Sequence, residues 1–139
     1  MTYVYSAHMQ AAFTVNTDTL AIELDAPTNV TVKIRRIRVM HSDGTATVSA
    51  DYYRKVKIIT ESAGGTGGST FTPIARDANA TPAISTVKTG LTALGTVDKT
   101  VDIYATHSTN DFIWQAVDED DKIVVKPGIF FGIVINPAN

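Results

Sequence analysis

The stretch from Leu20 to Asp25, Leu-Ala-Ile-Glu-Leu-Asp, decides the class of fold because large apolar side chains alternate in it with small or acidic ones. Successive side chains of a β-strand point to opposite faces of the sheet. The leucine and isoleucine side chains therefore share one face, and Glu23 lies on the other. This period of two predicts a half-buried strand with its apolar face in the core and Glu23 on a polar face.

The same period recurs along most of the chain, and helical spacing of apolar residues is almost absent. Turn-forming residues separate the apolar stretches, as expected of short strands with tight connections. Further strands are predicted at Val30–Met40, Val48–Ile59, Ala83–Lys88, Val97–Thr106, Phe112–Val117, Ile123–Val125 and Ile129–Ile135. Leu91–Leu94 is assigned to a loop. The pattern predicts an all-β protein, an antiparallel sandwich or barrel.

Two of the predicted strands carry additional information. Within Val30–Met40 the apolar residues occupy even positions up to Ile34 and odd positions from Ile37 onward. Such a change of parity requires a β-bulge or a crossing between sheets near Arg35-Arg36. Ile129–Ile135 is apolar on both faces, which is typical of a strand in the centre of a sheet or covered by another subunit.

Composition excludes several classes of function. The chain has 139 residues, no cysteine and a formal net charge of −2. The absence of cysteine removes thiolate metal sites, a cysteine nucleophile and disulfides. The start of the chain lacks the pattern of a signal peptide, and the longest apolar run, Ile129–Ile135, is too short to span a membrane. The length suits one domain, 1–139, and near-neutrality predicts no membrane and no nucleic-acid partner.

A glycine-rich stretch, Gly64–Ile74, divides the chain into two β-patterned halves. Its four glycines in five residues permit backbone conformations that other residues avoid, so the stretch is predicted to be a flexible loop. It opens a long excursion at residues 62–82, and long excursions commonly carry binding sites. A phosphate-binding loop is disfavoured, because no lysine follows the glycines and no helix is predicted.

Titratable residues do not form a recognisable catalytic or metal-binding motif. His8, His41 and His107 lie far apart, and none has the spacing of a metal ligand or of a catalytic triad. The acidic segment Asp118–Asp121 is predicted to be a solvated hairpin turn; calcium binding and complementarity to a basic patch are the alternatives. The sequence predicts a protein that is not an enzyme and that needs no cofactor and no metal.

Basic residues cluster in two predicted strands, which could form one positively charged sheet face if the strands pair. They are Lys33, Arg35, Arg36 and Arg38 in the first strand and Arg54, Lys55 and Lys57 in the second. An exposed sheet face or a subunit contact is the favoured interpretation. Nucleic-acid binding is the alternative, since Tyr52 and Tyr53 lie close enough in sequence to stack on bases.

Several motifs follow one another in a characteristic order. A strand within Phe13–Leu24 precedes Pro-Thr-Asn, a Val-x-Val-x-Ile-x-Arg-Ile-x-Val strand, Gly-Gly-Ser-Thr-Phe-Thr-Pro at Gly67–Pro73 and a late Phe-x-Trp strand. This order resembles small virion proteins of tailed bacteriophages, with departures at Ile74–Asp77 and in the acidic turn. The resemblance implies a jelly-roll β-sandwich that decorates or cements the capsid as a homotrimer. It also implies the major capsid protein as partner and the virion surface as location, after synthesis in the host cytoplasm.

The excursion and the start of the chain supply the predicted partner contacts. These are Phe71, Pro73, Ile74 and Arg76 on the excursion, and Tyr3 and Tyr5 in a possible N-terminal arm at residues 1–12. The alternative function is a carbohydrate-binding or host-attachment module, such as a head fibre or receptor-binding protein. Such a module requires exposed aromatic side chains in a groove. Phe112, Trp114 and Ala116 share one strand face and are predicted to lie in the core.

Overall fold

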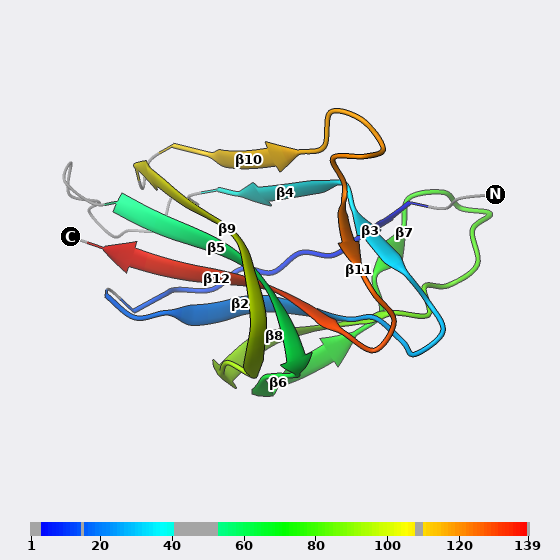
Figure 1. Cartoon of the computed structure of the whole chain (residues 1–139), viewed down its shortest axis with the longest axis horizontal. Helices are drawn as coiled ribbons and strands as arrows, with labels where there is room; N and C mark the ends of the chain where they lie inside the picture. The colour runs from blue at the N-terminus through cyan, green and yellow to red at the C-terminus, as the bar shows by residue number, and fades with distance from the viewer. Residues whose placement is uncertain (1–3, 15, 41–52, 108–109, 139) are drawn as a thin grey trace.

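The computed structural model describes residues 4–14, 16–40, 53–107 and 110–138. Within these residues the backbone forms twelve strands and no helix, and all strand pairs are antiparallel. The strands are β1 (Tyr5–Ser6), β2 (Thr19–Asp25), β3 (Val32–Ile34), β4 (Arg36–Val39), β5 (Tyr53–Ala63), β6 (Thr66–Phe71), β7 (Ile74–Ala75), β8 (Thr86–Ala93), β9 (Thr96–His107), β10 (Phe112–Gln115), β11 (Ile123–Val125) and β12 (Phe130–Ala138) (Figure 1). The prediction of an antiparallel all-β fold is confirmed.

The largest unit is a six-stranded sheet in the order β6-β8-β2-β12-β5-β9. Strand β12 lies inside it, paired with β2 on one side and with β5 on the other. This position confirms the central strand predicted from Ile129–Ile135. Both faces of β12 are buried, since Phe131 and Ile133 belong to one apolar cluster and Val134 belongs to another.

Two short strand pairs, β4–β10 and β3–β11, form a second layer (Figure 1). Strands β3 and β4 are two parts of one bent strand, separated only by Arg35. The Arg35 carbonyl oxygen accepts a hydrogen bond from the Ala116 N–H at 3.0 Å, where the partner strand also breaks between β10 and β11. The predicted irregularity near Arg35-Arg36 is therefore present as a break in the strand.

The main core lies between the six-stranded sheet and this second layer. Its buried members include Val56, Ile58, Phe131 and Ile135 from the sheet and Ile37, Phe112 and Val125 from the facing strands. Burying each such side chain contributes about 1.5–3 kcal/mol. Ala116 is also buried and Trp114 packs against the cluster, which confirms the predicted core face of Phe112–Val117.

The strand pairs at the two edges of the six-stranded sheet, β5–β9 and β6–β8, are joined to each other by two short connections (Figure 1). Two residues separate β5 from β6, and two separate β8 from β9. Ala63 pairs with Thr96 before the turn, and Thr66 pairs with Ala93 after it. The β5–β9 pair at one edge of the sheet thus continues into the β6–β8 pair at the other edge.

The connecting residues of this turn, the corner, are Gly64, Gly65, Leu94 and Gly95. The two backbones approach each other so closely that side chains do not fit. A Cβ at Gly95 would lie 1.9 Å from the Ala63 carbonyl oxygen, and a Cβ at Gly65 would lie 2.6 Å from the Ala93 carbonyl oxygen. Glycine is therefore required here by the close approach of backbone to backbone.

The glycine-rich stretch forms a strand and is not the predicted flexible loop. Thr66–Phe71 pairs with β8, and β8 itself includes most of Leu91–Leu94, the other segment assigned to a loop. Gly67 and Gly68 have φ angles of 77° and 79°, beside a shift in the β6–β8 register. Both predictions were wrong because strand pairing uses backbone groups, which glycine also has, and an edge strand tolerates irregular backbone.

Candidate docking surface

The N-terminal arm and the excursion, which were predicted from separate parts of the sequence, lie side by side. Strand β1 pairs with β7, with Tyr5 opposite Ala75. A further backbone hydrogen bond runs from the Arg76 N–H to the Val4 carbonyl oxygen at 2.9 Å. The Tyr5 hydroxyl donates to the Thr81 carbonyl oxygen at 2.8 Å. These bonds fasten the arm to the excursion.

The side chains of this pair alternate between a half-buried face and an exposed one. Tyr5 and Ala75 are half-buried. The exposed side, the arm face, consists of Val4, Ser6, Ile74 and Arg76. Val4 is 41 % exposed and Ile74 is 57 % exposed. The arm face thus presents two branched apolar side chains beside an arginine.

The predicted contact residues differ in how accessible they are. Ile74 and Arg76 are exposed on the arm face, while Tyr5 and Phe71 are half-buried. Pro73 is buried, so it offers no exposed surface to a partner in this structure. It occupies the two-residue connection from β6 to β7, where a residue without an N–H loses no strand hydrogen bond. Tyr3 lies outside the described residues.

The basic residues do not form the single charged face that strand pairing would produce. Strand β4 pairs with β10, whereas β5 pairs with β9 and β12, so the two basic strands belong to different layers. Arg54 is buried, and its guanidinium donates to the Val39 and Asn110 carbonyl oxygens at 3.4 and 2.8 Å. Lys33 pairs with Glu119 at 2.7 Å. Arg38 and Lys57 also form ion pairs, with Asp111 and Asp18.

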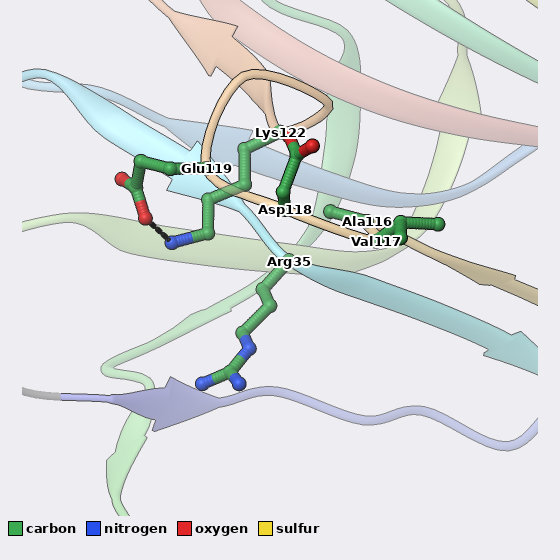
Figure 2. Close-up of a pocket in the computed structure, with 6 residues that line it drawn as sticks. All are labelled: Arg35, Ala116, Val117, Asp118, Glu119 and Lys122. Carbon is green, nitrogen blue, oxygen red and sulfur yellow. Dashed lines mark hydrogen bonds and ion pairs between the residues drawn. The ribbon is translucent and has the colours of Figure 1, made fainter.

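A shallow hollow of about 300 Å³ lies beside the break between β3 and β4 (Figure 2). It is lined by Arg35, Ala116, Val117, Asp118, Glu119 and Lys122. Figure 2 shows the Arg35 side chain pointing away from the ion pair of Glu119 and Lys122. Lys122 and Lys33 lower the pKa of the Glu119 carboxyl to about 2. The hollow is polar and open, and the charge of Glu119, one of its two acidic residues, is balanced by Lys33 and Lys122.

The acidic segment Asp118–Asp121 is an exposed turn, as predicted, but the strands on its two sides do not pair with each other as in a hairpin. It joins β10 to β11, and both of these strands pair with the same bent strand, β3–β4. The Asp118 carboxylate accepts the N–H groups of Asp120 and Asp121 at 2.9 and 3.2 Å, which stabilises the turn itself. The described residues contain no group of three or more histidine, aspartate or glutamate side chains placed to hold a metal ion.

A charged cluster near the N-terminal end of β2 ties the preceding segment to the sheet. Asp18 accepts hydrogen bonds from Lys57 Nζ at 2.5 Å and from Asn136 Nδ2 at 2.7 Å. These two contacts, with that of Lys57 the larger, lower the pKa of Asp18. Asp18 and Lys57 are partly exposed, so water screens their attraction.

A second buried cluster lies on the face of the sheet away from the main core. This corner cluster consists of Leu20, Ile59, Leu91 and Val134. Strand β2 contributes Leu20 to it because the β2–β12 register shifts at this point and moves Leu20 to the face opposite Ile22. The prediction that Leu20 and Ile22 share one face was therefore wrong, since a β-bulge reverses the alternation.

Two glutamates are buried on the same face as the corner cluster. Glu23 is 1 % exposed and Glu61 is 0 % exposed. Glu23 Oε2 accepts the Gly65 N–H at 2.6 Å, and Glu61 Oε1 accepts the Gly95 N–H at 2.7 Å. Each carboxyl group thus holds one of the two connections of the corner.

This carboxyl pair was missed because the sequence places Glu23 on a face that was expected to be polar and exposed. Burial raises the pKa of Glu61 to about 7; the neighbouring Glu23 raises it as well, while the Gly95 N–H acts in the opposite direction. The nearest signal in the sequence is the adjacent Gly64-Gly65, which shows that backbones approach closely but not which side chains they cover.

Neither of the two described histidines, His8 and His107, belongs to a group that could hold a metal ion. His8 is exposed, His107 packs edge-on against Tyr53 with ring centroids 6.1 Å apart, and His41 lies outside the described residues. The described residues form strands and turns only, so they include no helix that could cross a membrane. Comparison with protein-family models, with curated proteins and with solved structures finds no match for this chain.

Proposed function

We propose that this protein is a structural virion protein that decorates or cements the capsid of a tailed bacteriophage and docks through the arm face. The observation that carries the proposal is the pairing of the arm with the excursion, which builds an exposed surface from two segments distant in sequence. Val4 and Ile74 present apolar area there, and Arg76 adds a charge that can orient a partner. Such a surface contributes to binding when a partner removes it from water.

The proposed fold type is a jelly-roll β-sandwich, and the two packed layers of antiparallel strands support it. Sheets joined by an apolar core are rigid, and a rigid surface loses little conformational entropy when it docks. The proposed partner is the major capsid protein, the proposed oligomer is a homotrimer, and the proposed location is the capsid surface. In this role the protein adds buried interface between capsid subunits and transforms no substrate.

The alternative, a carbohydrate-binding or host-attachment module, has less support. Trp114 packs against the main core and does not stand in a groove. Of the described aromatic side chains, only Tyr53 is exposed. A sugar platform usually combines an exposed aromatic face with a concave polar site, and the hollow near Arg35 is lined by charged residues without an aromatic ring.

Ile74→Asp tests the proposed docking surface. Because Ile74 is exposed, the variant should keep the stability of the wild type to within about 0.5 kcal/mol. It should lose binding in co-sedimentation with capsids that lack the protein, since a carboxylate would enter an apolar contact. Val117→Asp is the matched control, because Val117 is 90 % exposed and lies in the hollow, away from the arm face.

Two outcomes would contradict the proposal. Normal capsid binding by Ile74→Asp would show that the arm face is not the docking surface. The homotrimer would be contradicted if the native mass in solution remained that of a monomer even at protein concentrations as high as those on particles. Deletion of residues 64–82 is not a clean test, because it removes β6 and the Gly65 N–H that binds Glu23.

A further inference from the structure

The carboxyl pair under the corner leaves two oxygen atoms without hydrogen-bond donors. Glu23 Oε1 and Glu61 Oε2 are buried and have no partner among the described residues. The two carboxyl groups are neighbours, since they hold the two connections of one corner through the Gly65 and Gly95 N–H groups, and Glu23 contributes to the raised pKa of Glu61. As carboxylates, both groups are acceptors only, so neither can satisfy the other. A single proton between them would convert two unsatisfied acceptors into one hydrogen bond.

Among the described residues, no charged group around the pair forms an ion pair with either glutamate. Lys88 on β8 lies opposite Glu23 in the register, and Asp25 follows Glu23 on the same face of β2. On β9, Val97 lies opposite Glu61, and the charged residues that follow it, Asp98 and Lys99, are both exposed. The residues of β12 opposite the two glutamates are Phe130 and Gly132, which carry no charge. All ion pairs of the described residues involve other carboxylates.

A bound cation fits this site less well than a proton. The N–H groups of Gly65 and Gly95 point at the two carboxyl groups and present positive partial charge to them. Calcium and magnesium prefer about six or more oxygen ligands, whereas only two oxygens of the pair are free. Two like charges in a buried site are instead relieved by protonation of one of them.

We propose that Glu23 and Glu61 share one proton and that this proton keeps the corner closed over the sheet. In the closed state Glu61 Oε2–H donates to Glu23 Oε1, while the other two oxygens hold the Gly65 and Gly95 amides. Loss of the proton leaves two adjacent buried carboxylates, which repel each other strongly at low effective dielectric constant. Opening of the corner admits water to both.

Because the corner is tightly packed, loss of the proton should open the corner alone and within a narrow range of pH. The close backbone contacts at Gly65 and Gly95 leave little space for small adjustments, so repulsion is relieved by separation of the connections and not by a gradual shift. The raised pKa of Glu61, to about 7, places the release of the proton near neutral pH. The device concerns the fold of a single chain and does not depend on the proposed docking.

The test is the melting temperature of the purified chain between pH 5.5 and pH 8.5. The folded state holds the proton more tightly than the unfolded state, so stability should fall as the pH rises through this range. We expect the wild-type melting temperature to fall by roughly 5–10 °C. Glu61→Gln should abolish this fall, because the introduced amide donates to Glu23 Oε1 and still accepts the Gly95 N–H. Glu119→Gln, at an exposed carboxyl, should retain it.

A folded Glu61→Gln variant with the same fall as the wild type would overturn the proposal. If that variant does not fold, carboxyl ¹³C titration of the wild type decides instead. A shared proton predicts that one of the two glutamate carboxyl signals titrates near pH 7, whereas titration of both below pH 5 overturns it. Millimolar calcium at pH 8.5 should leave the melting temperature unchanged. If calcium raises the melting temperature of the wild type but not that of Glu61→Gln, the site binds a cation and the proposal of a shared proton is overturned.

Amide hydrogen exchange can show which part of the protein opens when the pH rises. The protection factors of the Gly65 and Gly95 amides should fall at least tenfold more than that of Ile133, in the centre of the sheet, between pH 6 and pH 8.5. Equal loss of protection at all three amides would show that the molecule loosens as a whole, and would overturn a local opening of the corner.

Discussion

The two faces of the six-stranded sheet are buried in different ways. The face toward β3, β4, β10 and β11 is covered by apolar side chains of the main core, whereas the face under the corner combines four apolar residues with Glu23 and Glu61. The first face obtains its stability from burial alone. The second face also requires that every buried polar atom find a partner. Stability should therefore depend on pH under the corner and not in the main core.

Gly95→Ala should have the largest effect, because it breaks the corner by a steric clash. The new Cβ would lie 1.9 Å from the Ala63 carbonyl oxygen, and backbone cannot move aside without loss of strand pairing. We expect the free energy of unfolding to fall by more than about 3 kcal/mol, measured by urea titration.

Gly90→Ala is the matched control for this substitution. Gly90 has a φ of 69°, but no atom lies within 4 Å of the position that a Cβ would take there. Only backbone strain of about 1–2 kcal/mol should therefore appear. Equal losses in the two variants would show that the close approach at the corner is not what limits stability there.

Ile58→Ala should have the next largest effect and should act in the main core only. Ile58 is fully buried between the layers, and truncation of a buried isoleucine costs about 2–5 kcal/mol. Since no titratable group is involved, the loss should be the same at pH 5.5 and pH 8.5 in denaturant titrations. A loss that changes by more than about 1 kcal/mol between the two pH values would contradict the separation of the two faces.

The main core could be predicted from the sequence because a period of two survives wherever strands are regular. Phe112 and Trp114 were placed in the core correctly for this reason. The corner could not be predicted in the same way. The bulge that moves Leu20 to the other face is not marked by any residue type, and the burial of Glu23 depends on a connection far along the chain, at Gly65.

The candidate docking surface was predictable as a set of segments but not as a surface. The arm and the excursion were recognised separately from Tyr5 and from the stretch around Ile74. Their pairing depends on backbone hydrogen bonds between distant residues, which no local pattern specifies. The burial of Pro73 likewise follows from the path of the chain between β6 and β7 and not from its residue type.

Glu61→Ala tests the difference between the two sheet faces, because the stability that this substitution costs should depend on pH. At pH 5.5 the variant leaves the Gly95 N–H and Glu23 without their partner, which should cost about 2 kcal/mol. The pKa of Glu61 is raised from 4.5 to about 7, so the wild type itself should lose roughly 2 kcal/mol of stability between pH 5.5 and pH 8.5. At pH 8.5 the variant should therefore equal or exceed the wild type in stability. A cost that is independent of pH would contradict this.

Asp18→Ala should have the smallest effect and the opposite dependence on pH. Asp18 is hydrogen-bonded to Lys57 and Asn136 at the partly exposed end of the same sheet face, and these contacts lower its pKa below 3.8. Its contribution is therefore present above pH 4 and is lost as the pH falls through the lowered value. Because water screens this ion pair, we expect a loss of only about 0.5 kcal/mol at pH 7.

Asp18→Asn is the matched control, since it keeps an acceptor for Asn136 and removes only the charge. Urea titrations at pH 3 and pH 7 should show a cost for Asp18→Ala at pH 7 that shrinks at pH 3, with an intermediate cost for the control. Two carboxyl sites on one face of a sheet would then respond to pH in opposite directions. The surroundings of each carboxyl decide whether stability rises or falls with pH. A cation and water favour the charged form of Asp18, whereas burial and a second carboxyl favour the neutral form of Glu61.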